Sequence, residues 1–194
     1  MLIAAILVVF PFAMANAAVS DLLSMTISNR ISVILVAAFL VLAPLTGMPL
    51  DQIGWHVMAM LLVLTVCFTL FAAGAMGGGD AKLMSATALW FGMNMNLAVY
   101  FVVASFLGGL LTLAILRFRS SNVTVYTGNI DFLHRMANPQ EKIPYGIALG
   151  TAGLILFPET PLMVWVINQL ALGYDLHAEW RKWPVPQVAG FSAL

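Results

Sequence analysis

Two aspartates, Asp21 and Asp80, stand at the ends of apolar stretches, where a carboxylate is unusual. Asp21 ends the first apolar run, and Asp80 follows three glycines at 77–79 that end a later one. A carboxylate at the edge of a bilayer is costly to desolvate, so each aspartate is a candidate functional group. Two carboxyl groups at close range share one proton, and their pKa values separate. One can then take a proton from water while the other polarises a carbonyl, so the pair predicts peptide hydrolysis.

Each aspartate also has a purely structural interpretation. Asp80 suits the N-cap of the helix that follows it, and Lys82 then merely extends to the lipid headgroups. Asp21 stands at the C-terminal end of a helix, where the helix dipole disfavours an anion by roughly 0.3–1 kcal/mol. No Lys or Arg lies within eight residues to neutralise it. It also suits a solvated loop, and position alone leaves these alternatives open.

The composition indicates a polytopic membrane protein. Of 194 residues, 62% are hydrophobic and 8% are charged, whereas a soluble domain carries about a quarter charged residues. We therefore expect an all-α fold, a transmembrane helical bundle of about six spans in the lipid bilayer. The formal net charge is zero, so no attraction to nucleic acid is implied.

The first apolar run has two interpretations. It contains Ala15-Asn16-Ala17, which looks like a signal-peptidase site, but it lacks the positive n-region of a secretory signal. We expect instead a first transmembrane helix, followed by a short polar loop or interfacial turn at 21–30. The glycines at 77–79 predict a close backbone approach beside Asp80, where a side chain would block an extended substrate.

The other crossings follow from apolar length. The 34 residues between Lys82 and Arg117 carry no charge, and they suffice for two short crossings with a turn near 92–96. The stretch 117–142 predicts a solvent-side loop. The expected spans cover about 2–20, 31–45, 54–73, two crossings within 83–116, and a last span that starts near 144 and is interrupted by Pro158 and Pro161. We divide the chain into a transmembrane domain, 1–157, and a C-terminal extension, 158–194, with a polar tail.

Basic residues predict the orientation in the membrane. With six spans, one side carries Arg30, Lys82, Arg117, Arg119, Arg135 and Lys142. The opposite connectors carry no Lys or Arg, so the basic side is expected in the cytoplasm, and both aspartates fall on that side. The histidines at 56, 134 and 177 are scattered and form no ligand cluster, so we expect no metal and no cofactor.

At these residues the sequence resembles the prepilin peptidases, the GxGD family of membrane aspartyl proteases. Gly77, Gly79 and Asp80 match GxGD, and Lys82-Leu83 extend the match to GxGDxKL. Asp21, with Ile27 and Asn29 after it, resembles the family's first motif, an aspartate followed by Ile-Pro-Asn. Pro144-Tyr145-Gly146 resembles the opening of its last span. The resemblance covers about residues 1–157.

The resemblance implies a membrane aspartic endopeptidase with Asp21 and Asp80 as catalytic residues. Gly77 and Gly79 would give the backbone room, and Asn29 and Lys82 would support the site. The implied substrate is a pilin precursor, whose short cytoplasmic leader is cut just after a glycine at the bacterial inner membrane. Neither the identity of the pilin nor the oligomeric state follows from the sequence.

The sequence also departs from the family pattern. Ser28 stands where the family has proline, and the loop before Asn29 lacks the usual arginines. The large cytoplasmic domain with paired CxxC zinc motifs is absent. The chain thus resembles the short branch that serves Flp/Tad pili, which implies leader cleavage without N-methylation.

Two rival functions stay open at this point. The first is another GxGD intramembrane protease that cuts within signal peptides. The second, from a different class, is a small transporter or structural subunit that uses Asp80 as a proton or cation site. The transporter predicts that Asp21→Asn leaves function largely intact, whereas the protease predicts complete loss.

Overall fold

The structure is a computed structural model that describes residues 1–120 and 143–172, and every regular element in these ranges is a helix. The all-α expectation is therefore confirmed for the described residues. The elements are α1 (Leu2–Ser24), α2 (Asn29–Leu45), α3 (Leu50–Ala72), α4 (Gly78–Phe91), α5 (Met95–Arg119), α7 (Tyr145–Leu156), the 3-10 helix η2 (Phe157–Glu159) and α8 (Pro161–Leu172).

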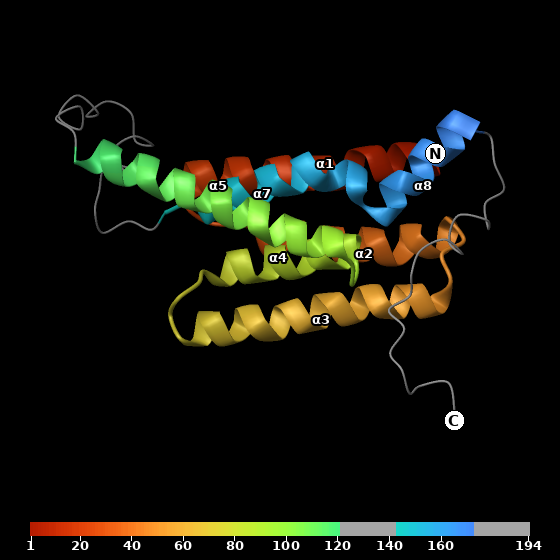
Figure 1. Ribbon diagram of the computed structural model, residues 1–194, viewed down its shortest axis with the longest axis horizontal. Coiled ribbons are helices and arrows are strands. Elements are labelled where there is room, and N and C mark those ends of the chain that lie inside the picture. Colours follow the sequence, from red (N-terminus) through yellow and green to blue (C-terminus); the bar gives the residue numbers. More distant parts are fainter. Residues whose placement is uncertain (121–142, 173–194) are drawn as a thin grey trace.

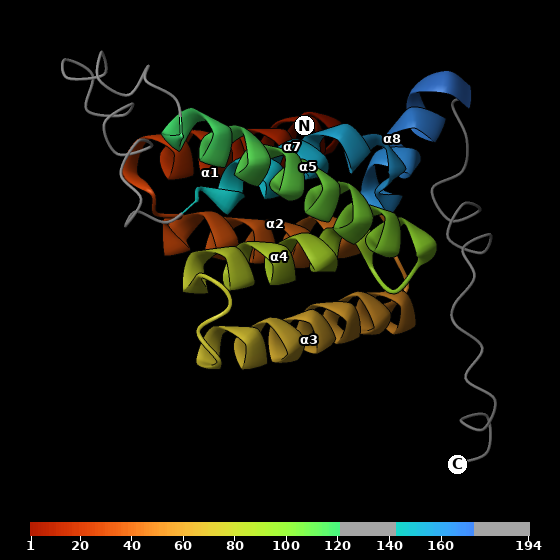
Figure 2. The same cartoon turned by 60° about the vertical axis from the view of Figure 1, so that its left-hand side comes forward.

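The helices lie side by side and alternate in direction (Figure 1). Figure 2 shows α3 along one side of the bundle, α2 and α4 in the middle, and α1, α5 and α7 on the other side. The C-terminal ends of α1 and α3 therefore lie at the same end of the bundle as the N-terminal ends of α2, α4 and α7. We call this end the Asp21 end.

Helix α4 is the centre of the packing. Every residue from Ser85 to Phe91 is buried, and the hydroxyl groups of Ser85 and Thr87 are satisfied because they donate to backbone carbonyls one turn earlier in the helix. Trp90 packs on Phe10 and Phe39, with ring centroids 4.9 and 6.0 Å apart. Its indole N–H donates to the carbonyl of Leu35 over 3.0 Å. These contacts hold α4 against α1 and α2.

The outer helices carry apolar side chains on their exposed surface. Val8, Phe12 and Val19 of α1 are 53–68% exposed, and Phe68 and Phe106 on α3 and α5 are 61% and 65% exposed. Such a surface suits contact with lipid rather than water. Among the described residues, three helices, α1, α3 and α5, are long and apolar enough to cross a membrane. The pair formed by residues 145–159 and 161–171 makes a fourth if it counts as one span. The shorter α2 and α4 have 17 and 14 residues.

The predicted turn near 92–96 is confirmed between α4 and α5. Gly92 adopts φ +74°, which glycine tolerates and other residues rarely adopt. Asn94 is the N-cap of α5, and its side chain accepts a hydrogen bond from the backbone N–H of Leu97. His56 Nδ1 lies 2.7 Å from the Leu89 carbonyl oxygen, which fastens the turn to α3.

Helix α1 extends past Asp21, and α7 ends at a bend. The expected loop from Asp21 to Arg30 is wrong in extent, because α1 continues through Asp21 to Ser24 and α2 begins at Asn29. Met25 ends α1 in the left-handed conformation, with φ 53°. The interruption by Pro158 and Pro161 is confirmed, because η2 separates α7 from α8 and the pair bends by 42°. Most of the predicted loop 117–142 and the polar tail after 173 lie outside the described residues.

Candidate active site

Asp21 is buried in the last turns of α1. Its side chain is 5% exposed, and its Oδ2 accepts a hydrogen bond from the backbone N–H of Gly146 over 2.6 Å. Gly146 lies in the first turn of α7, where backbone N–H groups have no acceptor within the helix. The α1 carboxylate, placed at the disfavoured end of its own dipole, thus meets the favourable end of another helix.

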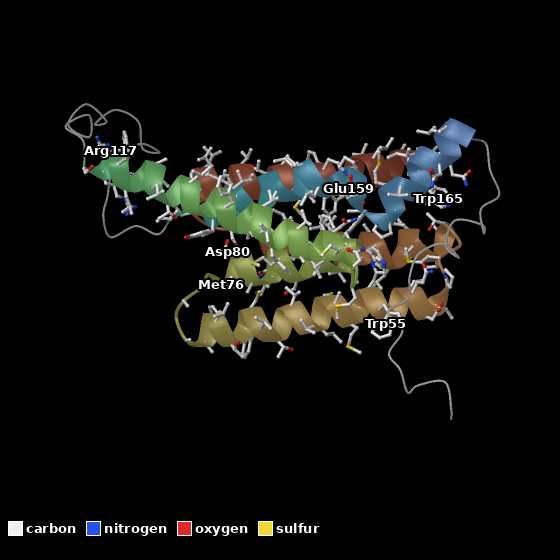
Figure 3. The ribbon with its side chains drawn as sticks, in the orientation of Figure 1. Trp55, Met76, Asp80, Arg117, Glu159 and Trp165 are labelled. Carbon is white, nitrogen blue, oxygen red and sulfur yellow. The ribbon has the colours of Figure 1, made fainter. Side chains whose placement is uncertain are left out.

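Asp80 lies in the first turn of α4 and is half-buried. The N-cap of α4 is Gly77, so the alternative that Asp80 is the N-cap is wrong. Its place in the first turn still suits a carboxylate, because the dipole is positive there. Figure 3 shows Asp80 and Arg117 toward one end of the bundle, and Trp55 and Trp165 toward the other.

Both aspartates line one cavity of about 270 Å³ at the Asp21 end. Gly77–Asp80 contribute one wall, Asp21 a second, and the linker after α1 a third. The complete lining is Asp21, Met25, Thr26, Ile27, Gly77, Gly78, Gly79, Asp80, Ile143 and Pro144. The sequence places these groups up to 123 positions apart (21 to 144), and the packing of α1, α4 and α7 brings them together. The cavity is large enough for a water and part of a peptide backbone.

A second cavity of about 380 Å³ adjoins the first and is more apolar. Gly77, Asp80 and Ile143 line both cavities, so Asp80 stands where the two meet. The remaining walls of this second cavity come from the segment after α3 and from α4 and α7. They are formed by Gly74, Ala75, Met76, Met84, Tyr145 and Leu149.

The GxGD glycines have different neighbours. A Cβ atom on Gly77 would lie 2.6 Å from Asp80 Oδ2, and one on Gly79 would lie 3.2 Å from Ile27 Cβ. A Cβ on Gly78 would meet only the ring of Phe71, at 3.2 Å. Residues 77 and 79 therefore leave space for the Asp80 carboxylate and for the linker after α1.

Asn29 and Lys82 lie together but outside the cavity lining. The Lys82 ammonium donates to Asn29 Oδ1 over 2.9 Å, which ties the start of α4 to the start of α2. The bond joins two of the segments that line the cavity, because Asn29 follows the linker that contains Ile27 and Lys82 follows the segment that ends at Asp80.

Two residues of this site had no assigned role in the sequence. Gly146 and Ile27 touch Asp21 or the glycine segment, and in the sequence both stand within the family-like motifs. Within residues 1–120 and 143–172, no three His, Cys, Asp or Glu side chains are grouped as a metal site would require.

The fold and the cavity define the class: a helical membrane protein with two carboxylates in one cavity at the end of its bundle. A family model described as the type IV leader peptidase family matches residues 8–113, which is more than half of the chain. The chain belongs to the type IV leader peptidase family, and it is a protease of the prepilin leader peptidase type. No curated protein and no solved structure matches it.

Proposed function

We propose that Asp21 and Asp80 are the catalytic pair of an aspartic endopeptidase that removes the leader of a prepilin. The observation that carries the proposal is that two carboxylates from distant parts of the chain line one cavity. The family match covers both residues, together with Asn29 and Gly77–Lys82. Gly77 and Gly79 give the site room, and Asn29 and Lys82 support it.

The reaction needs one ionised and one protonated carboxyl group. The carboxylate removes a proton from water, whose oxygen attacks the scissile carbonyl carbon, and the carboxyl group donates its proton to the carbonyl oxygen. When this tetrahedral intermediate collapses, the C–N bond breaks and the aspartate that removed the water proton gives it to the leaving amine. The other aspartate takes its proton back from the hydroxyl group, which restores both carboxyl groups. Either aspartate can fill either role in this scheme.

The neighbouring apolar cavity suits a substrate that is anchored in the membrane. A prepilin would place its apolar segment along Met76, Met84 and Leu149 and present the leader to the polar cavity. We propose an Flp-type pilin as the substrate and the cytoplasmic face of the bacterial inner membrane as the location. The basic residues at the Asp21 end, Arg30, Lys82, Arg117 and Arg119, support this orientation. Leader cleavage without methylation is part of the same proposal, as is a separate C-terminal extension after residue 157.

A transporter that uses Asp80 alone is the less favoured function. A transport site is expected near the middle of the membrane. Asp80, by contrast, is in the first turn of α4 and shares its cavity with Asp21.

The test is cleavage of a co-expressed Flp-type prepilin in membranes, with wild type, Asp21→Asn and Asp80→Asn. We expect each substitution to lower the rate by about 10²–10⁴-fold, as for loss of a general acid or base. Asp51→Asn, an exposed aspartate in the first turn of α3, is the matched control and should cleave normally. Cleavage at the wild-type rate by either active-site variant, at normal protein levels, would refute the catalytic pair.

A further inference from the structure

The start of α7 supplies the backbone N–H group that holds the Asp21 side chain. Gly146 N–H donates to Asp21 Oδ2 over 2.6 Å, and a carboxylate is a favourable acceptor for a backbone N–H at the start of a helix. We propose that Gly146 is a positioning residue, whose N–H fixes the Asp21 carboxylate for catalysis and whose lack of a side chain is required for this. The inference rests on the proposed function of Asp21.

The Gly146 N–H donor is itself held in place, because the neighbouring Tyr145 packs against α5. The Tyr145 hydroxyl lies 3.1 Å from Thr112 Oγ1 of α5, in hydrogen-bonding distance. The Tyr145 ring also covers Gly108, where an added Cβ atom would lie 2.8 Å from the ring. The first turn of α7 is thus clamped between α5 and α1, and Gly146 N–H has little freedom to follow a moving carboxylate.

Residue 146 has no room for a side chain. A Cβ atom there would lie 2.8 Å from each of Asp21 Oδ2, Asp21 Cβ and Ile27 Cδ1. Cβ atoms in real proteins essentially never approach within 3.0 Å of such atoms. Any other residue must therefore displace either the carboxylate or the start of α7. A displacement of about 1 Å in a catalytic group lowers the rate by about 10²-fold.

The bond also determines which oxygen serves the reaction. With Oδ2 engaged by Gly146, Oδ1 is the Asp21 oxygen left for the reaction, whichever of the two roles Asp21 fills. The charge-assisted bond restricts rotation of the carboxyl group. Gly146 N–H thereby fixes the orientation of the Asp21 carboxyl group.

A second glycine of α7 provides the contrast that the test needs. Gly153 lies on the same face of α7 and also packs on α1, but its added Cβ atom would meet the flexible Met14 side chain, with Sδ at 2.9 Å. Gly153→Ala therefore tests packing of α7 on α1 without touching Asp21.

The experiment is steady-state cleavage of a purified prepilin by the full chain in detergent, with thermal unfolding measured for every variant. We expect Gly146→Ala to lower kcat by about 10²-fold with KM unchanged, because the substrate still binds and only the carboxylate is misplaced. Gly153→Ala should retain the wild-type kcat. Equal effects of the two substitutions, or a wild-type kcat in Gly146→Ala, would overturn the proposal.

A second variant distinguishes the effect of the contact with Asp21 from the effect of the contact with Ile27 when residue 146 carries a Cβ atom. Ile27→Val removes Cδ1, one of the three crowding atoms, and makes Gly146→Ala easier to accommodate. We expect the double variant to stay well below Ile27→Val alone in kcat, since the Asp21 contact persists. Recovery to the Ile27→Val rate would assign the defect to Ile27 and refute a positioning role. Wild-type cleavage by Asp21→Asn is the different result that would refute the proposed function itself.

Discussion

Lys82 Nζ lies 2.9 Å from Asn29 Oδ1, and this hydrogen bond connects the start of α4 with the start of α2. Neither side chain lines the cavity, yet each directly follows a segment that does. Ile27 and Asp80 stand two residues before Asn29 and Lys82, respectively. The bond therefore acts as a brace between two of the cavity walls, the linker after α1 and the segment that ends at Asp80.

We expect Lys82→Met and Asn29→Ala each to lower the cleavage rate by about tenfold, the equivalent of one hydrogen bond to a charged group. The two residues act through one bond, so the double variant should be no worse than either single variant. The measurement is kcat/KM of the four proteins. Arg30→Met removes the adjacent exposed cation and should have little effect. Additive losses at 29 and 82 would argue against the brace.

The three consecutive glycines should differ in their tolerance to alanine. Gly77→Ala should lower kcat by about 10²-fold, because its Cβ atom would lie 2.6 Å from Asp80 Oδ2 and displace the carboxylate. Gly78→Ala should be nearly harmless, because only the movable Phe71 ring stands in the way. Gly79→Ala should be intermediate. Cleavage kinetics with protein levels as control would rank the three, and the reverse order for 77 and 78 would contradict this explanation.

Substitution of Gly92 in the turn between α4 and α5 should lower the stability of the fold rather than impair catalysis directly. Gly92→Ala should destabilise by at least about 1–2 kcal/mol, because φ is +74° and the Cβ atom would lie 2.7 Å from the His56 ring. Gly54→Ala, with nothing within 4 Å, is the control and should be neutral or slightly stabilising. Thermal unfolding in detergent measures both. Equal unfolding temperatures for the two variants would contradict the strained turn.

Substitution of Trp90 should also lower the stability of the fold. Trp90→Phe removes the indole N–H that donates to Leu35 and part of a fully buried side chain. We expect a loss of roughly 1–3 kcal/mol. Trp55→Phe, at a half-buried position on α3, should have a smaller effect. The free energy of unfolding by SDS titration measures the difference, and a larger effect at Trp55 would be inconsistent with α4 as the packing centre.

Several features of this protein follow from the sequence alone, because they depend on local pattern. Apolar length predicts the helices, and Gly92 and Asn94 carry the turn residues that separate α4 from α5. The proline pair at 158 and 161 predicts the bend after α7. The motif around Asp80 predicts the family, which the match over residues 8–113 confirms. The end of α1 was harder to place, because a carboxylate at residue 21 looks like the start of a loop until Gly146 supplies its partner.

Only the tertiary structure decided how distant groups meet. Gly146 and Asp21 are 125 residues apart, and no periodicity relates them. The side-chain direction of Asp80 likewise decides whether the space beside Gly77 is open to a substrate or taken by the Asp80 carboxylate. The physical reason is that local sequence determines where a helix begins and which residues are apolar. The approach of α7 to α1, which creates the hydrogen bond to Asp21, depends on the packing of all the helices together.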